Sequence, residues 1–347
     1  METCPPTDPA ASPVTPSEAS ELRHKMDEHF ASRTSMVEID AMMRAYATGL
    51  APARGMLNAT ASFLRLHPEA CHAIAAQLLD PRTTRRSREM MMGLLGSAGS
   101  PAAQLGMRST LDVPEVRSDV PSFARLILRL GLLAEPDRES LHYLLTLLVA
   151  PGIAENAELR RVTALALGSS SRRAGDADRG LADAIHARLV SGITSSSTAS
   201  DTIGFIAAVG NAGRAGDVAM LLEVARGHAG DAAVREAVAR ALRGIDSPET
   251  RIALRELLAD PNADVVCAAA EAYAARPLTK SDMTELATLV SGGGTVAIAD
   301  SAMLGIVQEH MGHRDAATQI LETILARHPD GVVVGRVLRL LCRLRGP

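Results

Sequence analysis

Apolar side chains recur with helical spacing in pairs of short segments, and this pattern constrains the fold more than any other feature. Residues 231–242 are the clearest case. The apolar positions of this segment are Val234, Ala237, Val238 and Ala241. Their i, i+3, i+4, i+7 spacing places them on one face of a helix. Gly244 and the Ser247-Pro248 dipeptide break this helix, and a second apolar helix is predicted to follow and to end near Leu258.

The same two-helix unit recurs along most of the chain. The other predicted pairs are 87–95 with 101–111, 122–130 with 136–149, 157–168 with 176–190, 200–210 with 216–226, 264–275 with 281–290, and 296–308 with 315–326. A single pair cannot bury its apolar face, whereas stacked pairs form a continuous core. We therefore predict an all-α fold, a right-handed α-α superhelix of helix pairs, with Leu242 at the centre of its best repeat.

The two ends of the chain are less regular than its middle. Residues 1–20 are rich in Pro, Ser and Thr and are predicted to be a disordered tail. Residues 21–86 are predicted to form irregular N-terminal helices, and residues 87–347 the repeats. The last helix, 331–345, has no partner helix. Its arginines are expected to form a polar outer face that caps the stack.

Composition excludes several classes of protein. Aromatic residues make up only 2% of the chain, which disfavours a β-sandwich or barrel. The net charge of −4 gives no general attraction to nucleic acid. No run of 18 or more apolar residues is present, so no transmembrane segment is predicted. The cytoplasm is the expected location, and a periplasmic or surface lipoprotein is the alternative if a lipoprotein signal precedes Cys4 in the full protein.

A more specific pattern appears at Phe205-Ile-Ala-Ala-Val-Gly-Asn-Ala-Gly213, with related segments at Ala164-Leu-Ala-Leu-Gly168 and Gly99-Ser-Pro-Ala-Ala103. With the helix pairs, these segments resemble HEAT repeats, and in particular the helical domain of large lipid transfer proteins such as vitellogenin and microsomal triglyceride transfer protein. The resemblance covers about residues 87–275 and implies an association with lipid transport. In that family β-sheets enclose the lipid. Because this sequence shows no such strand pattern, the implied role would need a sheet-containing partner.

Motifs that carry catalytic chemistry are missing from the sequence. It has no H-E-x-x-H, and Ser291-Gly-Gly-Gly294 lacks the Lys-Ser/Thr of a phosphate-binding loop. No G-x-S-x-G motif is present either. We therefore expect that the chain is not an enzyme and has no catalytic residue, metal site or cofactor. A HEAT-like lyase or glycosylase remains an alternative.

The polar residues on the second helix of each pair are the candidate contact residues, because these helices are expected to line the concave face of the superhelix. They are His142, Asp183, His186, Glu223, Arg255, Glu285 and Glu322. This mixed, slightly acidic set favours a protein or peptide partner, and no nucleic acid. The alternative is a lipid-transport-associated helical domain. No stoichiometric lipid is expected on the chain alone, since its apolar faces are used between repeats.

Overall fold

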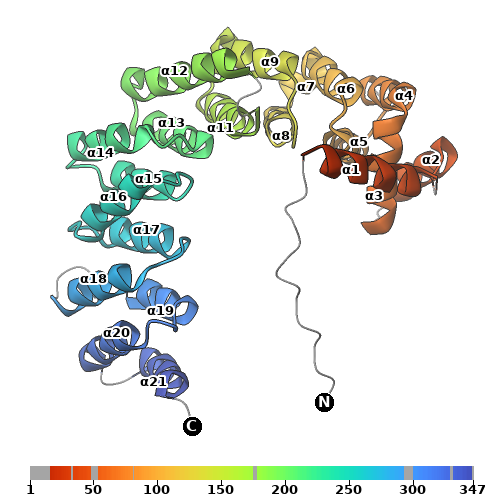
Figure 1. Ribbon diagram of the computed structural model, residues 1–347. Helices are drawn as coiled ribbons and strands as arrows, with labels where there is room; N and C mark the ends of the chain where they lie inside the picture. Colours follow the sequence, from red (N-terminus) through yellow and green to blue (C-terminus); the bar gives the residue numbers. More distant parts are fainter. Residues whose placement is uncertain are drawn as a thin grey trace, which may run out of the picture. The chain divides into compact units, whose positions relative to one another are not determined.

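The structure, a computed structural model, describes residues 16–32, 34–47, 54–80, 82–174, 178–292, 300–328 and 331–345. Every regular element in these ranges is a helix, which confirms the predicted all-α fold. The chain divides into two compact units, Met1–Ser140 and Leu141–Pro347. Figure 1 shows the helices of each unit.

The first unit contains eight described helices and the start of a ninth. They are α1 (Pro16–Ala31), α2 (Met36–Ala47), α3 (Arg54–Leu66), α4 (Pro68–Leu79), α5 (Arg85–Ala98), α6 (Pro101–Leu111), α7 (Pro114–Ser118), α8 (Val120–Gly131) and α9 (Arg138–Val149). Helix α1 begins at Pro16, within the segment predicted to be a tail. Residues 1–15 lie outside the described ranges. Helix α5 crosses the predicted boundary after residue 86 and packs against α3, α4 and α6.

The second unit continues from α9 with two rows of paired helices. They are α10 (Pro151–Ala154), α11 (Ala157–Ala174), α12 (Arg179–Ser195), α13 (Ala199–Ala212), α14 (Asp217–Gly227), α15 (Ala232–Leu242), α16 (Pro248–Leu258), α17 (Ala263–Ala274), α18 (Lys280–Ser291), α19 (Asp300–Glu309), α20 (Arg314–Arg327) and α21 (Val332–Arg345). The predicted pairs are all present, with ends shifted by a few residues. The first residues of the predicted helix 296–308 lie outside the described ranges.

The first helices of successive pairs pack directly on one another in the second unit. This row consists of α11, α13, α15, α17, α19 and α21. The second helices, from α12 to α20, form the other row. Figure 1 shows the row of first helices on the inner side of the arc that this unit makes, and the row of second helices on its outer side.

Glycines explain why the first helices approach so closely. A Cβ atom added at Gly168 would lie 2.1 Å from the carbonyl oxygen of Ala208 on the next first helix. A Cβ atom at Gly210 would lie 2.6 Å from the Cα atom of Ala241. Backbones thus meet where a side chain would separate them. Because close spacing in one row bends a stack toward that row, the row of first helices lies on the inside.

The core follows the predicted apolar faces. Leu242 and Val238 are fully buried, which confirms the predicted inward face of α15. The last helix exposes Arg339 and Arg343, as predicted for its outer face. Leu338 is 47% exposed and Cys342 is also exposed beside them, so the exposed side of α21 is partly apolar.

Candidate interaction surface

The structure places the predicted contact residues on second helices, as the sequence indicates. His142 lies on α9, Asp183 and His186 on α12, Glu223 on α14, Arg255 on α16, Glu285 on α18 and Glu322 on α20. From α12 onward these helices form the outer row of the second unit (Figure 1). The expectation that they line the concave face is therefore wrong for this unit, since backbone contacts through glycine draw the first helices inward. Their role in binding stays a prediction.

Several of these charged side chains are bonded to other side chains of the second unit. Arg255 on α16 forms an ion pair with Glu285 on α18. Asp183 pairs with Arg214 at 2.8 Å, in the turn before α14. These ion pairs connect successive segments of the outer row, so the side chains help to hold the stack together.

Arg226 on α14 extends this pattern. Its guanidinium lies 2.8 Å from Glu256 on α16 and 2.6 Å from Glu223 on its own helix. Both carboxylates raise the pKa of Arg226, Glu256 most strongly. In return, the hydrogen bond from Arg226 lowers the pKa of Glu256. All three side chains are exposed, so the energetic effect on stability is small.

His186 on α12 bonds to a buried carboxylate on α14. Its Nε2 atom lies 2.6 Å from Oδ1 of Asp217, which is only 5% exposed. The other carboxylate oxygen of Asp217 is buried and has no hydrogen-bond partner among the described residues. The pair therefore fixes α12 against α14. The spacing of the two residues, 31 positions apart, gave no signal of this contact in the sequence.

The inner row carries a different kind of surface, centred on a hollow between α17 and α19. Its lining residues are Arg243, Glu271, Ala274, Ala275, Ala302, Gly305, Ile306 and Glu309. Three of these are charged, and none of the three forms an ion pair or a side-chain hydrogen bond with another described residue. This hollow was not predicted from the sequence, because its lining comes from α17, α19 and the turn after α15, which are separate in the sequence.

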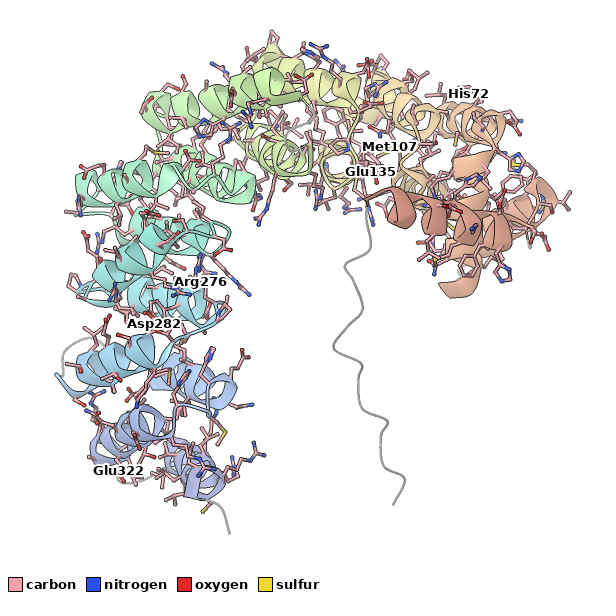
Figure 2. The ribbon with its side chains drawn as sticks, in the orientation of Figure 1. His72, Met107, Glu135, Arg276, Asp282 and Glu322 are labelled. Atoms are coloured by element: carbon pink, nitrogen blue, oxygen red, sulfur yellow. The ribbon has the colours of Figure 1, made fainter. Side chains whose placement is uncertain are left out.

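Arg276 fixes the helix ends beside this hollow (Figure 2). It is 8% exposed and donates hydrogen bonds to the carbonyl oxygens of Ala272, Leu242 and Ile245. Burial lowers its pKa. The end of α15 receives a second arginine, since Arg172 donates to the carbonyl of Gly244 at 2.9 Å. Arg276 thus holds the ends of α15 and α17 together, and Arg172 connects the end of α15 to α11.

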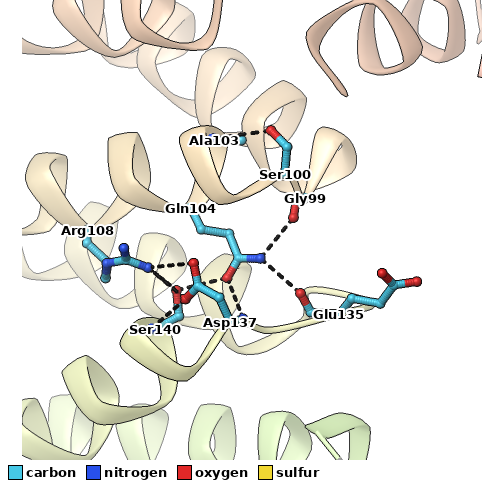
Figure 3. A network of polar contacts seen from close by, with 8 residues as sticks. All are labelled: Gly99, Ser100, Ala103, Gln104, Arg108, Glu135, Asp137 and Ser140. Carbon is cyan, nitrogen blue, oxygen red and sulfur yellow. Dashed lines mark hydrogen bonds and ion pairs between the residues drawn. The ribbon is translucent and has the colours of Figure 1, made fainter. Parts of the chain in front are cut away.

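A separate polar cluster lies within the first unit, around Gln104 on α6 (Figure 3). Its Nε2 group donates to the carbonyls of Gly99, at 2.8 Å, and Glu135, at 2.9 Å. Its Oε1 atom accepts from the backbone N–H of Asp137 and from the hydroxyl of Ser140, both at 2.9 Å. The buried amide thus has four hydrogen-bond partners, and these bonds fix the loop before α9.

No group of three or more His, Cys, Asp or Glu side chains is placed to hold a metal ion within the described ranges. Among the helices that the structure describes, none has both the length and the hydrophobicity needed to cross a bilayer.

Comparison with known proteins agrees with the fold. A family model for HEAT repeats matches residues 187–275. The chain is similar to a solved structure of lipovitellin that concerns its lipid–protein interactions. The TM-score is 0.58, the sequence identity is 15%, and the match covers 93% of this chain. This chain spans 34% of that lipovitellin chain. A search of curated proteins by sequence finds no match.

Two further solved structures show weaker similarity. Human deoxyhypusine hydroxylase in complex with glycerol has a TM-score of 0.36 and 18% identity, over 81% of this chain and 97% of its own. The CpcE–CpcF complex of phycocyanin lyase from Nostoc sp. PCC7120 has a TM-score of 0.40 and 17% identity, over 70% of this chain and 94% of its own. The match to the family model shows that the chain contains HEAT repeats at 187–275, in agreement with its HEAT-like helical fold.

Proposed function

We propose that this chain is a non-catalytic binding module for a protein partner, with a contact surface on the inner row of the second unit. The observation that carries this proposal is the contrast between the two rows. On the outer row, Arg255 and Asp183 are already paired with other side chains. On the inner row, Glu271 and Glu309 are exposed around a hollow and have no such pair with a described residue.

Two buried polar pairs support a non-catalytic role, because both hold helices together. Arg235 pairs with Asp260 at 2.7 Å, and both side chains are buried. The hydroxyl of Tyr273 donates to Asp282 at 3.1 Å, and burial raises the pKa of this tyrosine to about 12. Side chains used in this way fix the register of adjacent helix pairs.

Filling the hollow tests this function. A Cβ atom added at Gly305 meets no atom within 4 Å, so Gly305→Leu is expected to fold while it occupies the hollow. Gly180→Leu on α12 is a matched control, because its position is equally open and lies on the outer row. The two variants and the unmodified chain would be crosslinked to partners in the native host and analysed by mass spectrometry.

We expect the crosslinked partner to be lost in Gly305→Leu and retained in Gly180→Leu. Retention in both variants would contradict the proposed surface. Loss of the crosslinked partner in Gly180→Leu alone would instead place the contact site on the second helices.

A lipid-associated role is the second candidate, and the structural similarity to lipovitellin over 93% of this chain favours it. The chain spans only 34% of that protein, so the role would require further chain or a partner. Protein purified without detergent would be extracted with organic solvent and analysed by lipid mass spectrometry. We expect no stoichiometric lipid on the isolated chain, and one or more lipids per chain would make this the leading function.

A further inference from the structure

We infer that the hollow between α17 and α19 binds a cationic side chain, arginine or lysine, from an extended segment of the partner. This inference rests on the proposed function and specifies the chemistry of its contact. The evidence comes from the shape of the hollow, the charges at its rim and the helices that end there.

The hollow has space for a slender side chain because its wall is built from small residues. Ala302 and Gly305 lie one turn apart on α19, facing Ala274 near the end of α17. Ile306 is 1% exposed and forms an apolar floor. Apolar walls suit the methylene stem of Arg or Lys, which packs on such surfaces while its charged end stays at the rim.

The rim carries two carboxylates without a partner cation. Glu271 on α17 and Glu309 on α19 are both exposed and line the same hollow. Neither forms an ion pair within the part of the chain that the structure describes. Arg243 lines the hollow as well but makes no ion pair with either of them. A cationic side chain of the partner would therefore be attracted by two carboxylates that have no ion pair with a described residue.

Both carboxylates lie where a helix disfavours negative charge. Glu271 is in the last turn of α17 and Glu309 is the last residue of α19, near the negative ends of the helix dipoles. Helices α14, α15, α16 and α20 have an arginine in the last turn, whereas α17, α18 and α19 have no basic residue there. A partner cation would supply the positive charge that the end of α19 lacks.

The nearby arginines do not reach the end of α19. Arg276 donates to the carbonyls of Leu242 and Ile245 and to that of Ala272 in the last turn of α17. Arg243 follows the last residue of α15, where its charge complements the end of that helix. Its free guanidinium can bind a carboxylate or carbonyl of the same partner segment, which would set the direction of the segment.

The test is a titration followed through the carbon-13 signals of residues that line the hollow. The intact chain, labelled with carbon-13 at Ala and Ile methyl groups, would be titrated with acetyl-Ala-Arg-Ala-amide. Matched peptides would carry norleucine or Glu at the centre. The signals to follow are those of Ala274, Ala302 and Ile306, which line the hollow. The double variant Glu271→Gln/Glu309→Gln removes the carboxylates, and Glu158→Gln, at an exposed position on α11, is the control.

We expect saturable shifts with the Arg peptide, at least about threefold weaker binding of the norleucine and Glu peptides, and loss of this preference in the double variant. A difference of this size is what one or two exposed ion pairs provide. The control should retain the preference. Equal binding of the three peptides, preference for Glu, or no binding of the Arg peptide would overturn the inference. If the partner were nevertheless lost in Gly305→Leu, the proposed function would stand without it.

Discussion

The guanidinium of Arg276 donates a hydrogen bond to the carbonyl oxygen of Leu242, 2.7 Å away, across the interface between α17 and α15. A buried arginine is usually paired with a carboxylate. Here the carbonyl groups at the end of a helix accept its hydrogen bonds, and the negative end of the helix dipole complements its charge. One helix pair thus caps the first helix of the preceding pair.

Replacing Arg276 should destabilise the second unit. Arg276→Ala removes the charged donor from the carbonyls of Leu242 and Ile245, which each keep one weaker donor, and it opens a cavity. We therefore expect a loss of about 2–4 kcal/mol in the free energy of unfolding. Urea denaturation followed by circular dichroism would measure it. A loss below about 0.5 kcal/mol, as for an ordinary surface residue, would show that the cap is dispensable.

Substitution of the inner-row glycines should separate the first helices. Gly168→Ala places a Cβ atom against the backbone of Ala208, which cannot move as a flexible side chain can. We expect a loss of about 1–3 kcal/mol from overpacking. Gly305→Ala is the control, because its position is open and alanine has the higher helix propensity. It should stabilise α19 by up to about 1 kcal/mol. Equal effects of the two substitutions on thermal unfolding would contradict the close approach.

Leu242 provides a test of the core. Its side chain is fully buried in the best repeat, so Leu242→Ala should cost about 2–5 kcal/mol through lost burial and a residual cavity. The exposed Ile252 on α16 is a control within the same helix pair, and Ile252→Ala should cost much less. Chemical denaturation of both variants measures the difference, and similar losses would mean that the inward face is misassigned.

The ion pair between Asp201 and Arg160 should make stability depend on pH. The two side chains are 2.5 Å apart, and the hydrogen bond from Arg160 lowers the pKa of Asp201 from its ordinary value of 3.8. A lowered pKa in the folded state contributes stability above the unfolded value, and this contribution is lost as pH falls through the folded value. Asp201→Asn should therefore destabilise the chain at pH 7, by an amount that shrinks below about pH 4. Urea unfolding of both proteins across this range tests the sign, and a constant difference would contradict it.

Duplex DNA should bind weakly or not at all. The net charge is −4, so we expect a dissociation constant of ~10⁻⁴ M or weaker at physiological salt. Fluorescence anisotropy with a labelled duplex measures it. A salt-sensitive complex in the micromolar range would contradict this expectation.

The sequence by itself determined the helices, their pairing and their buried faces. Residues such as Val238 and Leu242 lie within one or two turns of each other, and a helix of fixed period places them on one side whatever surrounds it. Gly244 follows the end of α15 and Pro248 is the first residue of α16, so local backbone chemistry separates the two helices. These features needed no knowledge of distant contacts, so the sequence was enough to predict them.

Only the tertiary structure decided which row lies inside and where the candidate binding surface is. The inner row is set by the approach of Gly168 to Ala208 and of Gly210 to Ala241, residues more than 30 positions apart. The hollow likewise brings together Glu271 and Glu309 from different helix pairs. Helical periodicity gives the direction of a side chain relative to its own helix axis, but not the distance between two axes. That distance depends on which side chains, or which glycines, meet at each contact.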